Sequence, residues 1–267
     1  YYLGGGGEGT KTSTIFDYNI SNVQNITSSH KLDYQISFNG GHRDTEDKLR
    51  AHFPSNKVTN FTEKNFNERL KEIERKLTRG EIKPTEKLLL IIDSHGAESN
   101  KELTHSISLA NNKQVKDLNN LNGSDSVSLD RLKKIADLAE AKGVKLGIVD
   151  FSCHSGSTLN LAKKLSQNTC VISSTGPHHY GYAGSGVFAD LFMKELAKPH
   201  MNLEAAFLKA RKNSIDAGYP MISTPMHQMI ANEFYGDLTN LLYYERLNKE
   251  GKLVNHIKNK DIDCIDC

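Results

Sequence analysis

The sequence predicts an α/β fold with a mostly parallel central sheet and helices on both faces. Two observations indicate this class: short apolar runs of strand length, and amphipathic helical patterns that separate them. The clearest apolar runs are residues 88–92 and 144–149. Because strands and helices alternate along the chain, we expect right-handed crossovers and parallel strands in one three-layer sandwich.

The size of the chain fits a single domain. It has 267 residues and 37% hydrophobic content, which is enough for one sizeable core. We expect the domain to span residues 1–267, with its core at about 33–198 and a helical C-terminal part at 199–267. Residues 1–32 are expected to be turn-rich. Their glycines do not make a phosphate-binding loop, because Thr10 separates Gly9 from Lys11.

The first predicted strand covers residues 34–38, where Tyr34, Ile36 and Phe38 alternate with polar residues. A charged loop should follow at 42–47. Thr62 is a helix cap, and the helix after it should end at Gly80. Its apolar face comprises Phe66, Leu70, Ile73 and Leu77. The strand at 88–92 is apolar on both faces, as expected for a central parallel strand.

The polar segment 98–126 is predicted to be a small hairpin that contains residues 107–109 and 115–118, with a loop at Asn122-Gly123. Ser128 should open the next helix and Gly143 should follow its end. A strand at 144–149, a helix from about Gly156 and a strand at 169–173 come next. Beyond the loop at 177–186, we expect helices at 187–198 and 203–215.

Charge and composition exclude several classes of protein. Lys and Arg number 34 against 32 Asp and Glu, and no basic run with interleaved aromatics indicates a nucleic-acid partner. No apolar stretch reaches the roughly 18 residues of a membrane span. The chain begins with Tyr1 and is rich in Lys and Asn, so we expect a secreted or periplasmic bacterial protein whose leader has been removed.

Four cysteines are too few for a disulfide framework or a complete zinc site. We therefore expect no metal and no cofactor. The role of Cys264 and Cys267 at the C-terminus stays open between a free tail, a disulfide and a shared metal site. Cys170 lies inside an apolar strand and is expected to be a buried small hydrophobe.

Two strands end in reactive side chains. His95 and Gly96 follow the strand at 88–92, and Cys153 follows the strand at 144–149. Because active sites gather outside the carboxyl ends of parallel strands, we expect the two side chains to meet. Cys with His is a nucleophile with its proton partner. The small residues Ser155, Gly156 and Ser157 let a substrate backbone approach closely.

These motifs resemble those of the caspase-like cysteine peptidases of clan CD. That clan has a hydrophobic strand ending in His-Gly and a later strand ending in the catalytic Cys. His95 lies 58 residues before Cys153, close to the roughly 50 of caspases. The string Cys153-His154-Ser155-Gly156-Ser157 is most similar to the legumain branch, and the resemblance covers residues 33–198.

The resemblance implies the caspase-hemoglobinase fold and a cysteine endopeptidase that acts on peptide or protein substrates through a thioester acyl-enzyme. It implies Cys153 as nucleophile, His95 as general acid, and the backbone N–H groups of Gly96 and Cys153 as oxyanion hole. Self-processing is common in this clan, and segment 98–126 and the glycine-rich N-terminus are candidate processing regions. A long Cys–His distance would be compatible with these roles.

The resemblance also implies a pocket for the P1 side chain. It maps onto the loop after the first predicted strand, onto Asp150, and onto the segment after the strand at 169–173. The residues are His42, Arg43, Asp44, Asp150, Ser173, Ser174 and Thr175. The legumain branch often has an acidic residue two positions before the Cys, where this chain has Phe151. The P1 preference therefore stays open, and Asp150 is either a pocket residue or a structural group.

Five other histidines near these motifs have different expected roles, and two other functions are alternatives to a peptidase. His154 neighbours Cys153 and should point away from it. His178 and His179 are candidates for a site wall, whereas His42 and His105 are expected to be ordinary loop residues. The alternatives to a peptidase are a catalytically inactive peptide-binding pseudo-peptidase and a transpeptidase or ligase of the same fold.

Overall fold

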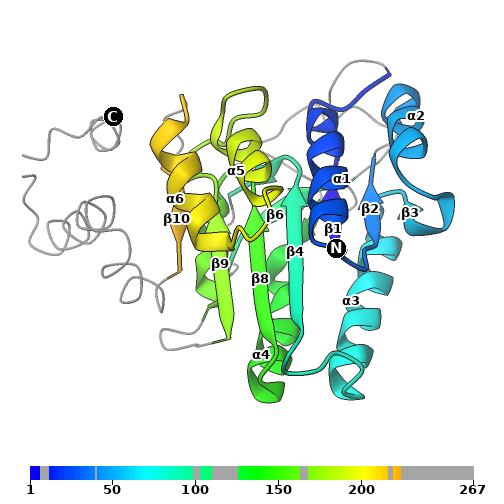
Figure 1. The fold of residues 1–267 in the computed structure, drawn as a ribbon, viewed down its shortest axis with the longest axis vertical. Coiled ribbons are helices and arrows are strands. Elements are labelled where there is room, and N and C mark those ends of the chain that lie inside the picture. The colour runs from blue at the N-terminus through cyan, green and yellow to red at the C-terminus, as the bar shows by residue number, and fades with distance from the viewer. Residues whose placement is uncertain are drawn as a thin grey trace, which may run out of the picture.

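The longest strands, β4 (Lys87–Asp93) and β8 (Lys145–Asp150), pair in parallel at the centre of a seven-stranded sheet. The computed structural model describes residues 1–6, 12–39, 41–98, 103–109, 126–162, 168–215 and 219–223. The strand order is β10-β9-β8-β4-β1-β2-β3 (Figure 1). Only β10 runs antiparallel to its neighbour. The predicted α/β class with a mostly parallel sheet is confirmed.

The remaining elements complete three layers. The other strands of the main sheet are β1 (Tyr2–Gly4), β2 (Ile36–Phe38), β3 (Val58–Thr59), β9 (Thr169–Ser173) and β10 (Met221–Ile222). The α-helices are α1 (Ile20–Ser29), α2 (Arg43–His52), α3 (Glu63–Thr78), α4 (Lys133–Lys142), α5 (Phe188–Leu196) and α6 (Leu203–Asn213). Short 3-10 helices are η1 (Asp17–Asn19), η2 (Ser55–Lys57), η3 (Leu129–Leu132) and η4 (Ser155–Leu161).

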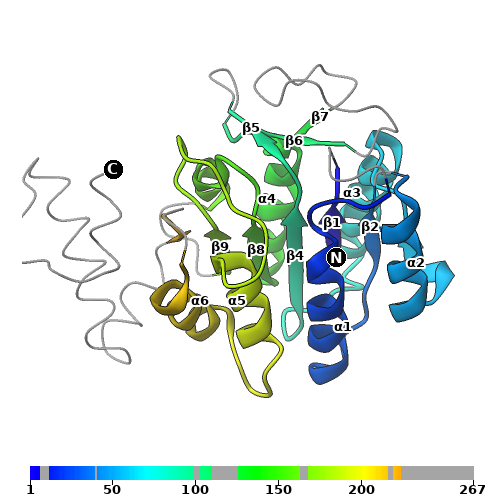
Figure 2. The same ribbon diagram turned by 90° about the horizontal axis from the view of Figure 1, so that it is seen from above.

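Two apolar cores hold these layers together. Helices α1, α5 and α6 cover one face of the sheet, and α3 and α4 cover the other (Figure 2). Alternate residues of each central strand face opposite cores: Ile91 and Val149 contact the α1/α5 side, whereas Ile92 and Ile148 contact the α3/α4 side. This is why the central strands are apolar on both faces.

Helices α3 and α4 begin and end where the sequence predicts. Thr62 accepts a hydrogen bond from the backbone N–H of Asn65 at 3.2 Å, and the apolar face Phe66, Leu70, Ile73 and Leu77 is buried. Ser128 accepts one from Asp130 at 3.1 Å and opens η3, which runs directly into α4. Gly143 ends α4 with a φ of 66°, a left-handed conformation that favours glycine.

The N-terminal segment is more regular than its composition predicts. Residues 2–4 are not a turn but strand β1, paired with both β2 and β4. Gly4 is required there: a Cβ atom would lie 2.1 Å from the carbonyl oxygen of Asp93. Helix α1 follows within the same segment. The predicted charged loop after β2 is also wrong, because residues from Arg43 onward form α2.

A small antiparallel sheet stands apart from the main one. It consists of β5 (Gly96–Ala97), β6 (Ser106–Ser108) and β7 (Ser126–Ser128). The first arm of the predicted hairpin is present as β6, which pairs with β5 on one side and with β7 on the other. Residues 115–118 and the Asn122-Gly123 loop lie outside the described residues.

The helix predicted from about Gly156 is present as the 3-10 helix η4. The helices at α5 and α6 agree with prediction. Most of the predicted helical C-terminal part lies outside the described residues, as do Cys264 and Cys267. Within the described ranges, no helix has both the length and the apolar character to cross a bilayer.

Candidate active site

His95 and Cys153 lie at the same edge of the sheet. Strands β4 and β8 are neighbours, and their last paired positions are Ile92 and Asp150. His95 and Cys153 each come three residues after these positions. Beyond the paired region the backbones stay together, because the N–H of Phe151 donates to the carbonyl of Ile92 at 2.9 Å. The two predicted chemical groups therefore leave adjacent strands at their carboxyl ends.

The thiol of Cys153 is surrounded by backbone N–H groups. The N–H of Gly181 donates to Sγ at 3.3 Å. The N–H groups of Gly96 and of Cys153 itself also interact with the sulfur and favour its charged form. Burial outweighs them and raises the pKa of the thiol above its ordinary value, with a smaller contribution from the charge of Asp150. The side chain remains partly exposed.

Gly96 must be a glycine for this approach to exist. A Cβ atom at position 96 would lie 2.1 Å from the carbonyl oxygen of Cys153. Because no side chain is present, the two backbones touch and the N–H of Gly96 reaches the sulfur. The backbone of Gly96 therefore lies directly beside that of Cys153.

His95 is partly exposed, and its ring packs edge-on against Phe16 with centroids 5.0 Å apart. Phe16 lies just before η1, on the α1/α5 side of the sheet. His154, the other histidine beside the thiol, has its ring nitrogen next to a backbone carbonyl. His154 is buried, its ring nitrogen Nδ1 lies 3.2 Å from the carbonyl of Pro177, and its backbone φ is 63°.

Asp150 does not line a pocket. The side chain is fully buried and both oxygens are occupied: Oδ1 accepts hydrogen bonds from the N–H and the Oγ of Ser152, and Oδ2 accepts one from Thr158 at 2.6 Å. The imidazole of His105 lies 3.5 Å from Oδ2. Of the two roles left open by the sequence, the structure supports the structural one.

The predicted pocket residues after β2 are not beside the thiol. His42 forms the N-terminal cap position of α2 and exchanges backbone-to-amide hydrogen bonds with Asn39, and Arg43 and Asp44 are exposed. Strands β1 and β4 lie between β2 and β8. The strand predicted to be the first is β2, and β1 precedes it in the chain, so the loop after β2 is not the loop after the first strand.

The residues after β9 do reach the thiol segment. The N–H of Ser174 donates to the carbonyl of Asp150 at 2.9 Å, and the N–H of Thr175 donates to Ser155 Oγ at 3.3 Å. Among the described residues, nothing forms a hydrogen bond with the buried hydroxyls of Ser173 and Ser174. Two polar groups are thus available at this edge.

The loop after Gly176 brings the remaining predicted wall residues to the site. His178 is exposed and its Nδ1 lies 2.6 Å from a carboxylate oxygen of Glu98, next to β5. The carbonyl of His179 accepts a hydrogen bond from the N–H of His154 at 2.9 Å. This loop also carries the exposed Tyr180 and Tyr182 on either side of Gly181.

A second buried carboxyl group at the edge was not predicted. Asp93 ends β4 on the α1/α5 side, where its Oδ2 accepts hydrogen bonds from the Tyr2 hydroxyl and the Asn19 amide, both at 2.8 Å. Burial raises the pKa of Asp93 to about 7, against the opposing effect of these two donors. Its partners are 91 and 74 residues away in sequence, so no local pattern indicates the cluster.

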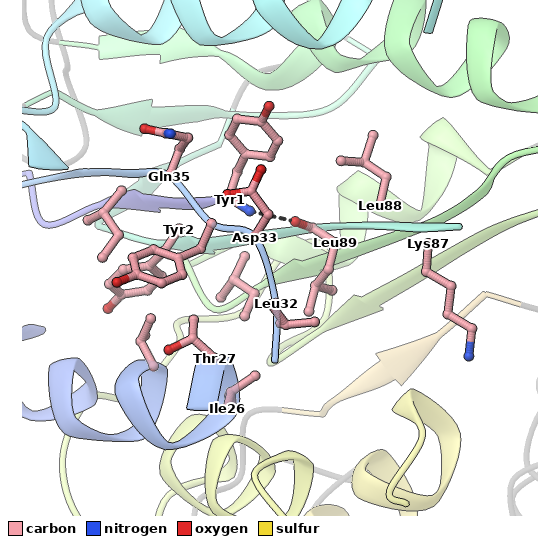
Figure 3. A pocket seen from close by; sticks show the side chains of 14 residues that line it. Tyr1, Tyr2, Ile26, Thr27, Leu32, Asp33, Gln35, Lys87, Leu88 and Leu89 are labelled. Carbon is pink, nitrogen blue, oxygen red and sulfur yellow. Dashed lines mark hydrogen bonds between the residues drawn. The ribbon is translucent and has the colours of Figure 1, made fainter. Parts of the chain in front are cut away.

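A cavity of about 90 Å³ lies at the opposite end of the sheet (Figure 3). It is lined by residues that precede or begin strands, such as Tyr1, Gln35 and Lys87, together with apolar side chains of α1. The backbone nitrogen of Tyr1 donates to the carbonyl of Leu89 there at 2.8 Å. This cavity belongs to the amino ends of the strands, remote from Cys153.

The sequence matches no protein-family model and no curated protein. Any functional conclusion therefore comes from the residues and geometry of this chain.

Proposed function

We propose that this protein is a cysteine endopeptidase of the caspase-like kind. The thiol proton of Cys153 passes to His95 as the sulfur bonds to the scissile carbonyl carbon, and the peptide C–N bond breaks as His95 gives that proton to the leaving amine. The product is a thioester acyl-enzyme. Water then adds to the thioester, which releases the carboxylic acid and returns the thiol.

The observation that carries this proposal is the ring of amide donors at the sulfur of Cys153. The Gly181 N–H donates to the sulfur at 3.3 Å, and the backbone N–H groups of Gly96 and Cys153 favour its charged form. Donors at the sulfur favour the thiolate, which is the form of the cysteine that attacks a carbonyl carbon. A structural cysteine needs no such surroundings. Cys170 on β9, for comparison, packs against the apolar core, and burial raises its pKa further.

The raised pKa of Cys153 agrees with a dyad in which the thiol and imidazole are not a resting ion pair. The thiolate is the nucleophile, so less of it is present at neutral pH than for a free thiol. Alkylation of Cys153 should therefore accelerate with pH up to a midpoint above that of an ordinary cysteine.

The P1 pocket is proposed on the α1/α5 side of the edge. In the family that this chain resembles, the wall comes from residues after the first strand, which is β1 in this structure. The described residues there include Tyr18 of η1, which lies near Asp93. Ser174 and Thr175 contribute the opposite wall after β9, as predicted from the resemblance.

Covalent labelling tests the proposal directly. The full chain is incubated with a mixture of peptidyl chloromethyl ketones that differ at P1, and the modified residue is located by mass spectrometry. We expect one adduct on Cys153, none on Cys153→Ala, and unchanged labelling of the matched control Cys170→Ala. Labelling of Cys170 instead, or of no cysteine, would contradict the assignment.

Cleavage assays on a fluorogenic peptide library separate the alternatives. Hydrolysis that Cys153→Ala abolishes supports a peptidase. Labelling without turnover indicates a pseudo-peptidase, and transfer of the acyl group to an added amine indicates a transpeptidase. Intact masses of wild type and Cys153→Ala after storage test self-processing, since only the wild type should shorten.

A further inference from the structure

A buried histidine lies behind the proposed nucleophile. His105 comes just before β6 and is 1% exposed. Its Nε2 is 2.7 Å from the hydroxyl of Ser152, and its Nδ1 is 3.1 Å from the hydroxyl of Ser157. Ser152 precedes Cys153 and Ser157 lies in η4, so the ring holds the chain on both sides of the thiol.

Each hydroxyl group near the His105 ring also lies within hydrogen-bond distance of another acceptor. Ser152 and Thr158 donate to the two oxygens of Asp150, each at 2.6 Å. Ser157 donates to the carbonyl of His154 at 2.9 Å. A carboxylate and a carbonyl only accept, and each hydroxyl has one proton to give. With Asp150 ionised, the hydroxyl oxygen of Ser152 is left as the acceptor for Nε2. When the Ser157 hydroxyl donates to the His154 carbonyl, its oxygen is left as the acceptor for Nδ1, and both ring nitrogens donate.

We propose that His105 is a buried imidazolium and a positioning residue for Cys153. Its charge is balanced by Asp150 of β8, whose Oδ2 lies 3.5 Å from Nε2. Among the described residues, Asp130 of η3 is a further charged group on this side, and it accepts hydrogen bonds from the N–H and the hydroxyl of Thr104, each at 2.8 Å. The thiol of Cys153 lies beyond Ser152.

The small antiparallel sheet links the proposed His105 cation to the backbone amide of Gly96 beside the sulfur. Gly96 of β5 is paired with Ile107 of β6, two residues after His105. The small antiparallel sheet therefore carries both groups: the Gly96 N–H lies beside the sulfur, and the His105 ring contacts Ser152. Displacing the ring should move the N–H of Cys153 relative to that of Gly96.

The protonation state is tested without reference to activity. In the full chain with ¹⁵N-labelled histidine, the ring signals of His105 are assigned by their loss in His105→Gln. We expect both nitrogens to be protonated at pH 7. In Asp150→Asn the new amide donates to one hydroxyl and frees its proton, so one His105 nitrogen should become unprotonated. An unprotonated nitrogen in the wild type would overturn the imidazolium.

The positioning role rests on the proposed function and is tested by kinetics. His105→Gln should lower kcat on a cleaved peptide by about 100-fold with KM nearly unchanged, because a displacement of about 1 Å has effects of this size. The matched control His30→Gln removes a ring whose Nε2 lies 2.7 Å from the carbonyl of Leu196, and it should retain full activity.

The outcomes separate the two proposals. Wild-type kcat in His105→Gln would overturn the positioning role. If that variant does not fold, Ser152→Ala removes a single hydroxyl of the network and should lower kcat in the same direction. A wild-type chain that neither cleaves nor labels would refute the peptidase, while the ¹⁵N spectra would still decide the charge of His105.

Discussion

Two buried carboxyl groups, Asp93 and Asp150, lie at the same edge of the sheet but have different hydrogen-bond partners. Asp93 ends β4 on the α1/α5 side and Asp150 ends β8 on the α3/α4 side. Asp150 accepts three hydrogen bonds distributed over both oxygens and faces the His105 ring. Asp93 accepts two, both at Oδ2.

The difference shows that burial alone does not set the state of a carboxyl group. Burial raises the pKa of Asp93 to about 7, because two neutral donors on one oxygen replace little of the lost hydration. Asp150 is held by donors on both sides and by the ring that we propose to be a cation. One carboxyl group therefore holds the segment around Cys153 through hydrogen bonds, whereas the other has a pKa near neutrality.

The largest effect is expected from Asp150→Ala. Removing the carboxylate leaves the proposed His105 cation buried without its partner, which typically costs about 3–5 kcal/mol. Urea unfolding at pH 7 measures this loss. A loss below about 1 kcal/mol would mean that the two carboxyl groups are alike after all.

The same conservative substitution should have opposite signs at the two positions. The folded-state pKa of Asp93, about 7, lies above the ordinary carboxyl value, so the folded protein binds a proton that the unfolded chain has released. Stability therefore falls as pH rises from about 4 to about 7. Asp93→Asn has no proton to lose and should be more stable than wild type at pH 8 by roughly 2–4 kcal/mol.

At pH 4 the Asp93→Asn variant and wild type should be equally stable, which provides the internal control. Asp150→Asn should be less stable than wild type at both pH values. Thermal unfolding of the three proteins at each pH gives the comparison. Equal pH dependence of Asp93→Asn and wild type would contradict the raised pKa.

Removing one donor from Asp93 should give a smaller effect. Tyr2→Phe keeps the ring stacked on Phe38 at 4.6 Å and deletes only the hydroxyl that favours the charged carboxylate. We expect the pKa of Asp93 to rise further and stability at pH 8 to fall by about 1–2 kcal/mol. Titration of the carboxyl ¹³C signal detects the shift, and an unchanged midpoint would rule out the hydroxyl as a contributor.

The smallest effect is expected at the exposed Asp33, which pairs with Lys57 at 2.8 Å. Asp33→Asn should change the unfolding free energy by about 0.5 kcal/mol or less, because exposed ion pairs contribute little. This variant calibrates the urea experiments on the two buried groups. A change as large as that at Asp93 would show that burial is not the source of the difference.

Much of the fold follows from local patterns. The helix caps Thr62 and Ser128, the left-handed Gly143 and the central strands are visible because neighbouring residues carry the signal. Strand β1 could not be predicted from local patterns, because it has three residues and lies in a glycine-rich segment. It forms a strand because β2 and β4 pair with it on both sides.

The same distinction holds for the candidate site, where residues at strand ends could be predicted and residues held by distant contacts could not. His95, Gly96 and Cys153 sit at strand ends, so sheet geometry places them together. The Asp93 cluster and the His105 network depend on contacts across 47 to 91 residues, and a histidine between Thr104 and Ser106 reads as an ordinary loop residue. Burial and hydrogen bonding, not sequence pattern, give these residues their roles.

The hydrogen bonds of Asp150 also limit how the nucleophile segment can evolve. Ser152 and Thr158 bind the same carboxylate, so residues 150–158 close into a ring that begins and ends on one side chain. Adding or deleting one residue would shift Thr158 by more than 3 Å and open that ring. The length of this segment is therefore fixed by geometry, whereas the loop that carries the exposed Tyr180 and Tyr182 has no such constraint from Asp150.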